Sequence, residues 1–232
     1  MLTLHRAAER GLTNWGWLES HHTFSFGDYY DPSHMGFRSL RVLNDDRVEA
    51  GAGFGTHGHR DMEILTYVLE GALEHRDSMG TGSIIRPGEI QFMRAGTGVT
   101  HSEMNASKTD PVHFLQIWVV PDASGLTPSY SQNPVDLERA EAGFVLMASR
   151  DGRDGSIQVH QDMDLHLARP DGTSAARLAL RSGRHAYVHV ARGKARLKDV
   201  DLDEGDGVAL SGESELSLTG RGRAEVLVFD LA

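Results

Sequence analysis

Residues 66–77 read TYVLEGALEHRD: an apolar strand-like run, a glycine turn and a more polar run. Residues 187–199, YVHVARGKARLKD, follow the same pattern. A second pair of stretches, RPGEIQFMRAG at 86–96 and DEGDGVALSGE at 203–213, comes after the first pair in the same order. Short strands bounded by glycine turns are typical of sandwiches and barrels, and an internal repeat indicates a duplicated unit. The sequence therefore predicts an all-β protein made of two tandem β-barrels of one architecture.

Further strand signals indicate where the two barrels end. Residues 113–120, HFLQIWVV, are typical of a buried strand, which Pro121 ends. Residues 121–143 contain three prolines among Ser, Asn and Gln, with a short helix expected near residues 135–141. We therefore predict a first barrel over residues 1–120, a linker over 121–143 and a second barrel over 144–232.

The composition of the chain excludes several classes of protein. Its 232 residues include no cysteine, which rules out disulfides, zinc–thiolate sites, iron–sulfur clusters and cysteine nucleophiles. A net charge of −10 repels phosphate backbones, so we expect no direct binding of nucleic acid. No apolar run approaches the ~18 residues of a membrane span, and the first residues lack the apolar segment of an export signal. We therefore expect a cytoplasmic protein without membrane contact.

The unusual feature of the composition is its 13 histidines, nine of which lie at or before His113. Two of them form His57-Gly58-His59, and a third begins His101-Ser102-Glu103. Residues two apart on a strand point to the same face, so each motif presents two side chains on one side. If the two strands are neighbours, three imidazoles and one carboxylate converge. Such a donor set suits Fe(II), Mn, Ni, Cu or Zn, and six-fold coordination leaves two positions open.

The spacing around these motifs resembles a known family. The patterns G-x5-H-x-H from Gly51 and G-x2-H-x3-N from Gly98 are similar to the two motifs of the cupin superfamily, whose small β-barrels carry a metal inside. More narrowly, five segments resemble the pirin family: HGHRDME (57–63), YVLEG (67–71), GEIQFMRAG (88–96), HSE (101–103) and LQIWV (115–119). The resemblance extends over about residues 15–120 and implies a bicupin, whose second half is another cupin barrel.

The resemblance also implies which residues bind the metal. In pirin-like proteins the carboxylate ligand is the one in His-x-Glu, so the expected set is His57, His59, His101 and Glu103. Many cupins instead use a glutamate a few residues after His-x-His, a place that Glu63 holds. Geometry inferred from the sequence alone leaves both carboxylates open. A polar cluster without metal is the remaining alternative.

The second barrel is expected to bind no metal. Aligning the glycine turns of the repeat gives four residues opposite the four expected ligands: Ala179, Arg181, Leu218 and Gly220. None of them is a metal-ligand type. We therefore expect a degenerate barrel that covers the first one, and this arrangement favours a monomer.

Several other residues of the first half have ordinary explanations. His75 and His113 alternate within strand-like runs and are expected to be packing or surface residues. Trp15 and Phe26 are expected in the core rather than at a substrate. Gln116 lies in a buried strand and needs a partner, which leaves pocket lining and structural hydrogen bonding equally open.

The pirin-like resemblance implies quercetin 2,3-dioxygenase activity, in which O2 opens the ring of a flavonol or related phenol and carbon monoxide is released. Glu103 is the expected catalytic residue, a general base for the 3-hydroxyl group. One divalent transition metal is expected, with Fe favoured and Ni, Cu, Mn, Co or Zn as alternatives. The family is also linked to protein partners, so the competing hypothesis is a regulatory protein with a structural or redox-sensing metal. A cupin isomerase or hydrolase is a third hypothesis.

Overall fold

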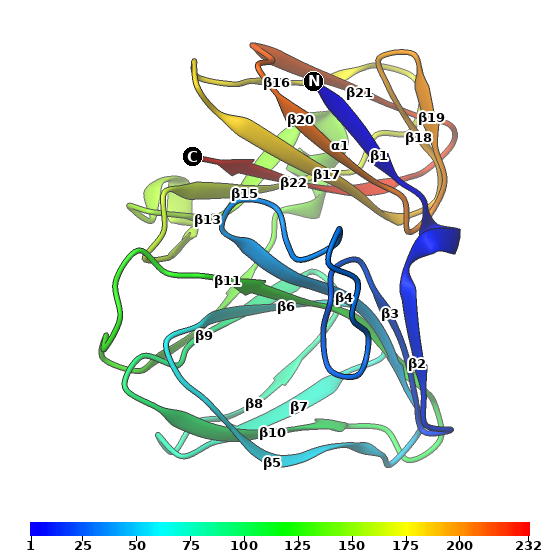
Figure 1. Cartoon of the computed structure of the whole chain (residues 1–232). Coiled ribbons are helices and arrows are strands. Elements are labelled where there is room, and N and C mark those ends of the chain that lie inside the picture. The colour runs from blue at the N-terminus through cyan, green and yellow to red at the C-terminus, as the bar shows by residue number, and fades with distance from the viewer. The chain divides into compact units, whose positions relative to one another are not determined.

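The computed structural model describes residues 1–232 and consists mainly of antiparallel strands (Figure 1). These strands group into two units, one of Gly11–Pro134 and one of Met1–Arg10 with Val135–Ala232. The α-helix α1 (Leu137–Ala142) and the 3-10 turns η1 (Ala7–Glu9) and η2 (Arg153–Gly155) are short. None of these helices has the length and apolar character needed to cross a membrane.

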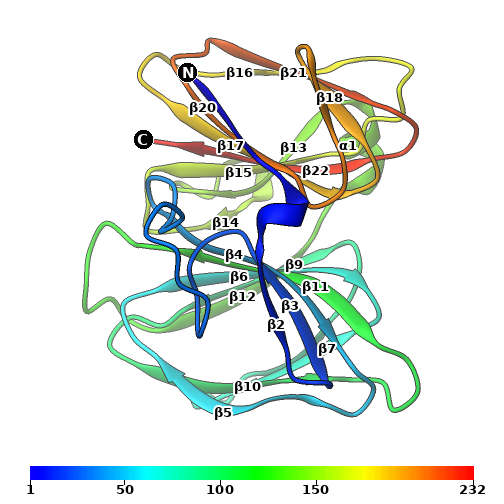
Figure 2. The same cartoon turned by 45° about the vertical axis from the view of Figure 1, so that its right-hand side comes forward.

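The first unit consists of two facing sheets. Its strands are β2 (Gly11–Asn14), β3 (Leu18–His22), β4 (Leu40–Val48), β5 (Gly53–His59), β6 (Glu63–Glu70), β7 (Leu73–Asp77), β8 (Gly82–Ile85), β9 (Glu89–Arg94), β10 (Val99–Asn105), β11 (Val112–Val119) and β12 (Ser129–Pro134). Seven strands form a sheet in the order β12-β9-β6-β11-β4-β3-β2, and four form a sheet in the order β5-β10-β7-β8. The two sheets are the two layers of this unit in Figure 1, and the rotated view in Figure 2 shows the same arrangement.

An apolar cluster fills part of the space between these sheets. Alternate residues of β6, β7 and β11 point inward there, and Val68, Leu73 and Phe114 are at most 1% exposed. Burying each such side chain contributes roughly 1.5–3 kcal/mol to stability. The next inward-facing residues, two positions from Val68 on β6 and from Phe114 on β11, are the polar Thr66 and Gln116. The interior of the barrel therefore changes from apolar to polar along its strands.

The second unit repeats this plan. Its strands are β1 (Leu2–His5), β13 (Phe144–Ser149), β14 (Ile157–Gln158), β15 (Met163–Ala168), β16 (Ala176–Ala179), β17 (His185–Arg192), β18 (Ala195–Leu197), β19 (Val200–Leu202), β20 (Gly207–Ser211), β21 (Glu215–Gly220) and β22 (Glu225–Leu231). Its sheets have the orders β1-β20-β17-β22-β15-β13-β14 and β16-β21-β18-β19. The segment β20-β17-β22-β15 corresponds to β9-β6-β11-β4, and the smaller sheet corresponds to β5-β10-β7-β8. This duplicated topology confirms the predicted pair of β-barrels.

Two glycines explain why the repeat is visible in the sequence. Gly71 joins β6 to β7 and Gly193 joins β17 to β18, with φ angles of 76° and 73°. A Cβ atom at Gly71 would lie 2.7 Å from the Pro111 carbonyl oxygen, and one at Gly193 would lie 2.3 Å from the Arg223 carbonyl oxygen. Both the left-handed conformation and the close approach therefore require glycine at these turns.

Strand pairing assigns the edge strands differently from the boundaries predicted at residues 120 and 143. β1 pairs with β20 of the second unit, and β12, inside the predicted linker, pairs with β9 of the first unit. The helix α1 follows Asp136, whose side chain accepts a hydrogen bond from the Arg139 backbone N–H. A sequence pattern identifies an edge strand but not the sheet that receives it. The division into 1–120, 121–143 and 144–232 therefore remains a prediction.

Candidate metal centre

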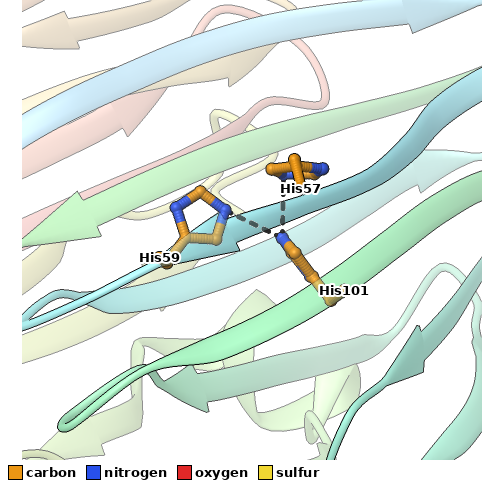
Figure 3. A group of neighbouring side chains, drawn as sticks. All are labelled: His57, His59 and His101. Carbon is orange, nitrogen blue, oxygen red and sulfur yellow. Dashed lines mark hydrogen bonds between the residues drawn. The ribbon is translucent and has the colours of Figure 1, made fainter.

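Three histidines converge on the inner side of the smaller sheet of the first unit (Figure 3). His57 and His59 lie on β5, and His101 on β10 is the direct register partner of His57. Nε2 of His101 is 3.0 Å from Nε2 of His57 and 2.9 Å from Nε2 of His59. The spacing of two along β5 and the antiparallel register together bring these ring nitrogens to one point. The structure thus brings together the three histidines that the sequence motifs single out.

Burial favours the neutral form of His59 and His101, and a backbone contact orients His57. His57 Nδ1 donates a hydrogen bond to the Gly55 carbonyl oxygen at 2.8 Å, which leaves a lone pair on Nε2. Burial, reinforced by the neighbouring His57, lowers the pKa of His59 to about 4 and the pKa of His101 to about 2. Unprotonated ring nitrogens this close repel one another unless a cation lies between them. The group therefore fits a transition metal with imidazole ligands.

Glu103 adds a buried carboxyl group to this site. It follows His101 by two residues on β10 and points to the same face. Gln116 Nε2 donates to Oε2 of Glu103 at 2.9 Å, whereas Oε1 has no hydrogen-bond partner. Burial raises the pKa of Glu103 to about 7. A carboxyl oxygen of Glu103 lies within 4.8 Å of ring nitrogens of His75 and His101, so a cation there would compensate the buried charge.

Glu63, the other carboxylate left open by the sequence, lies on a different face. It is three residues before Thr66 on β6, and residues three apart on a regular strand point to opposite sides. Thr66 Oγ1 donates to Gln116 Oε1 at 2.9 Å, so Thr66 is on the side of the histidines. Glu63 also belongs to neither group of side chains placed to share a metal. The fold therefore brings Glu103, and not Glu63, within 4.8 Å of His101 and His75, whereas His57 and His59 form the other group with His101.

A row of polar side chains crosses the inner face of the larger sheet. Neighbouring strands contribute register partners to it, in the order His22, Asn44, Gln116, Thr66 and Gln91. Within the row, His22 Nδ1 donates to Asn44 Oδ1 at 2.9 Å. Gln116 both lines the cavity beside the histidines and donates to the buried carboxyl group. Both explanations left open for Gln116 therefore apply.

His75 on β7 lies behind His101 and is completely buried. Its Nε2 donates to Asp77 Oδ2 at 3.0 Å, and its Nδ1 accepts from Gln91 Nε2 at 3.1 Å. His101 Nδ1 is 3.4 Å from His75 Nδ1 and is placed to donate to it. This contact leaves the lone pair of His101 on Nε2, where the three rings meet. A packing or surface role is expected for His75 from the sequence, although His75-x-Asp77 shows the same spacing of two as the other motifs.

A cavity of about 220 Å³ lies beside the histidines. Four aromatic side chains contribute to its wall: Trp15, Phe26, Phe54 and Trp118. The Trp118 ring is edge-on to Phe26 at 5.1 Å and to His59 at 4.8 Å. Trp15 and Phe26 thus line a cavity, whereas the sequence favours a place in the core. Aromatic walls with a few polar groups suit a flat aromatic ligand.

Leucines occupy the equivalent positions of the second barrel. Leu178 and Leu216 are register partners, as His57 and His101 are in the first barrel. Leu218 pairs with β18 in the way that Glu103 pairs with β7. The Leu180 backbone N–H bonds to the Ser214 carbonyl oxygen, which places Leu180 at the position of His59. These leucines belong to one apolar cluster.

The register corrects the residues obtained from aligning glycine turns. Ala179 and Arg181 are each one position beyond the true equivalents, and Leu218 and Gly220 are each two positions beyond them. The reason is loop length, because the connection from β16 to β17 is longer than that from β5 to β6, and the connection from β20 to β21 is shorter than that from β9 to β10. Both groups of side chains that could hold a metal lie in the first unit.

Comparison with known proteins finds similarity along both barrels. Residues 4–119 match the family model described as Pirin, and residues 146–231 match the one described as Quercetinase C-terminal cupin domain. The chain is 48% identical over 233 residues to a quercetin 2,3-dioxygenase from Escherichia coli, covering 100% of this chain and 99% of that protein. The crystal structure of YhhW from Escherichia coli matches with a TM-score of 0.96 at 47% identity, covering 100% and 98% of the two chains. A structure of bacterial pirin YhhW in complex with nickel(II) matches with a TM-score of 0.94 at 46% identity, covering 100% and 99%.

Proposed function

The chain belongs to the pirin family, and from this premise we propose that it is a metal-dependent quercetin 2,3-dioxygenase. The enzyme uses O2 to open the ring of a flavonol or related phenol and releases carbon monoxide. The observation that carries the proposal is the position of His57 and His59 in the wall of a cavity with aromatic sides, where His101 meets them. The same cavity contains a buried carboxyl group that can take up a proton.

We propose that His57, His59, His101 and Glu103 hold one divalent transition metal. The convergent Nε2 atoms and the unpartnered Oε1 of Glu103 support this donor set. When bound, the metal supplies Lewis acidity and the redox chemistry that O2 requires. Iron is the metal we propose, and nickel, copper, manganese, cobalt and zinc accept the same nitrogen and oxygen donors.

Glu103 is the proposed general base, which removes the proton of the flavonol 3-hydroxyl group. In the metal-free protein, burial of the carboxyl group raises its pKa to about 7, which favours uptake of a proton. Gln116 donates to Oε2 and so holds the carboxyl group in one orientation, in which it both binds the metal and accepts the proton. The rings of Phe26 and Trp118 hold the flat substrate beside the carboxyl group.

Metal analysis combined with quercetin turnover tests the proposal. The metal-loaded wild type should consume quercetin and O2 together, His57→Ala should lose both metal and activity, and Glu103→Gln should lose activity by at least about 100-fold. Glu63→Gln is the matched control, because Glu63 lies on the other face of β6, and it should retain the metal. Equal metal binding by His57→Ala would contradict the ligand set. A metal-loaded wild type that consumes neither quercetin nor O2 would contradict the enzyme.

The finer properties of the protein stay predictions. We propose a monomer that binds no nucleic acid, in keeping with its net charge of −10, and light scattering should give a mass near 25.4 kDa. The cytoplasmic location also stays a prediction from the sequence. A pirin-like regulatory protein would bind a protein partner and show no O2 uptake, so the turnover experiment separates the two hypotheses.

A further inference from the structure

Three residues in the wall of the cavity beside the histidines have a buried polar atom that no group of the protein satisfies. These atoms are Asp46 Oδ1, Glu103 Oε1 and Trp118 Nε1. About nine in ten buried polar groups of folded proteins have a hydrogen-bond partner, so three exceptions at one cavity point to a ligand. Glu103 is accounted for by the proposed metal. Asp46 and Trp118 have no such explanation.

Asp46 places a carboxyl group in the wall of the cavity. It lies on β4, is 3% exposed, and receives a side-chain hydrogen bond from Ser20, its register partner on β3. The charged groups that act on it are the carboxyls of Asp45 and Glu103, and no cation is among them. Burying such a carboxyl group is costly unless it forms further hydrogen bonds. A ligand that brings a hydroxyl group would supply the missing bond to Oδ1.

Trp118 supplies the opposite kind of group. Its Nε1–H can only donate, and this atom is buried without an acceptor. The indole ring is nearly perpendicular to His59 and to Phe26, at 85° and 80°. Because packing on these two sides fixes the ring, the unpaired N–H is held in a set direction. It is therefore a ready donor for an oxygen atom of a bound ligand.

We propose that Asp46 and Trp118 determine the specificity of this cavity, Asp46 by accepting a hydrogen bond from a ring hydroxyl and Trp118 by donating one to a ligand oxygen. The ligand class is a flat, uncharged polyphenol with a hydroxyl group remote from the oxygens that face the histidines. Two buried carboxyl groups in one cavity disfavour ligands that carry a carboxylate or a phosphate. The inference rests on the proposed function, but it concerns binding and not turnover.

Anaerobic fluorescence titration of the metal-loaded protein measures binding without turnover. The probes are quercetin and 3-hydroxyflavone, which has the same ring system and 3-hydroxyl group but lacks the other hydroxyls. At about pH 8, above the pKa of about 7 of Asp46, the wild type should bind quercetin about ten- to hundredfold more tightly, as expected for a hydrogen bond to a charged group. Asp46→Leu should remove this preference by weakening quercetin binding alone. Asp46→Asn, whose amide oxygen still accepts, should retain part of it.

A variant of Trp118 tests the donor. Trp118→Phe keeps an aromatic wall but removes the N–H, so it should weaken both flavonols by about tenfold. Asp45→Asn is the matched control for Asp46, because Asp45 is the next residue on β4 and faces the other side, where it accepts from His113 Nε2 at 2.6 Å. It should leave the preference for quercetin unchanged.

The outcomes separate this inference from the proposed activity. If Asp46→Leu prefers quercetin over 3-hydroxyflavone as strongly as the wild type does, the inference is overturned, even if turnover under O2 is normal. Loss of the preference in Asp46→Leu, in a protein whose wild type never consumes quercetin, supports the inference and contradicts the dioxygenase. A wild type that binds neither flavonol overturns both.

Discussion

His57 and His101 are register partners on β5 and β10, and their Nε2 atoms lie 3.0 Å apart. His59 Nε2 lies 2.9 Å from the same atom of His101, so His101 is shared by both contacts. We expect His101→Ala to weaken metal binding by more than about 100-fold, which exceeds the effect of removing a residue that only hydrogen-bonds to a metal ligand. Competition with a chromophoric chelator measures this.

A suitable control for His101→Ala is His34→Ala. His34 belongs to the same unit but contacts Asp31 and lies outside both candidate ligand groups. Its removal should leave metal affinity unchanged. Similar metal affinity in the two variants would show that the three rings do not form the metal site.

The contact from Asp77 to His75 predicts that Asp77 affects metal binding through His75 and His101, without contacting the metal. Asp77 Oδ2 accepts from His75 Nε2, which leaves His75 Nδ1 as the acceptor that faces both Gln91 Nε2 and His101 Nδ1. In Asp77→Asn the amide oxygen can still accept from the backbone N–H groups of Met79 and Thr81. The NH2 group then faces His75 Nε2, which must become an acceptor, so the ring proton of His75 moves to Nδ1. His101 then loses its acceptor, and metal affinity should fall about 10- to 100-fold.

Chelator competition also tests this prediction. Glu74→Gln is the control, because Glu74 is on the same strand and pairs with the exposed Arg76. It should bind metal as the wild type does. If Asp77→Asn binds metal with wild-type affinity, Asp77 and His75 have only a packing role.

Sequence patterns predict those parts of the site that depend on alternation along a single strand. His57-x-His59 and His101-x-Glu103 are recognisable because side chains two apart share a face. The polar row of His22, Asn44, Gln116, Thr66 and Gln91 does not follow from spacing, because its members meet only through the register of neighbouring strands. Register depends on turn geometry and burial, which a single strand does not contain.

The fold shows the same division between local and non-local information. The repeat predicts two barrels because Gly71 and Gly193 satisfy local turn requirements that leave a mark in the sequence. The partner of β1 is β20, more than 200 residues away along the chain, and no local pattern specifies such a contact. The equivalents of the ligands in the second barrel are displaced when turns alone are aligned, because the connections between strands differ in length.

Gly193→Ala tests the turn requirement. The substitution combines positive φ with a Cβ atom only 2.3 Å from the Arg223 carbonyl oxygen. Gly183 has a similar φ of 83° but no atom within 4 Å of an added Cβ, so Gly183→Ala carries only the conformational cost of about 1–2 kcal/mol. Urea unfolding should show a larger loss of stability for Gly193→Ala. Equal losses would mean that the close approach is relieved without cost.

Asp46→Asn predicts a change in the pH dependence of stability. Burial raises the pKa of Asp46 from 3.8 to about 7 in the folded protein. Between pH 3.8 and about pH 7 the folded state holds a proton that the unfolded state has released. The contribution of Asp46 to the stability of the wild type therefore falls as the pH rises through this range. Asparagine does not titrate. The free energy of unfolding of the variant, relative to the wild type, should therefore increase by up to roughly 1.4 kcal/mol per pH unit in that range and level off above it.

Urea unfolding of the metal-free protein at about pH 4.5, 6 and 8 measures this difference. Removing the metal matters because Glu103, whose carboxyl group acts on Asp46, also belongs to the proposed ligand set. Titrating groups outside the cavity affect both proteins alike, so they cancel in the comparison. A difference that stays constant with pH would show that Asp46 is ionised in the folded protein as readily as in the unfolded chain. The partnerless Oδ1 would then be satisfied by water, and the cavity would be wetter than a site for a flat polyphenol requires.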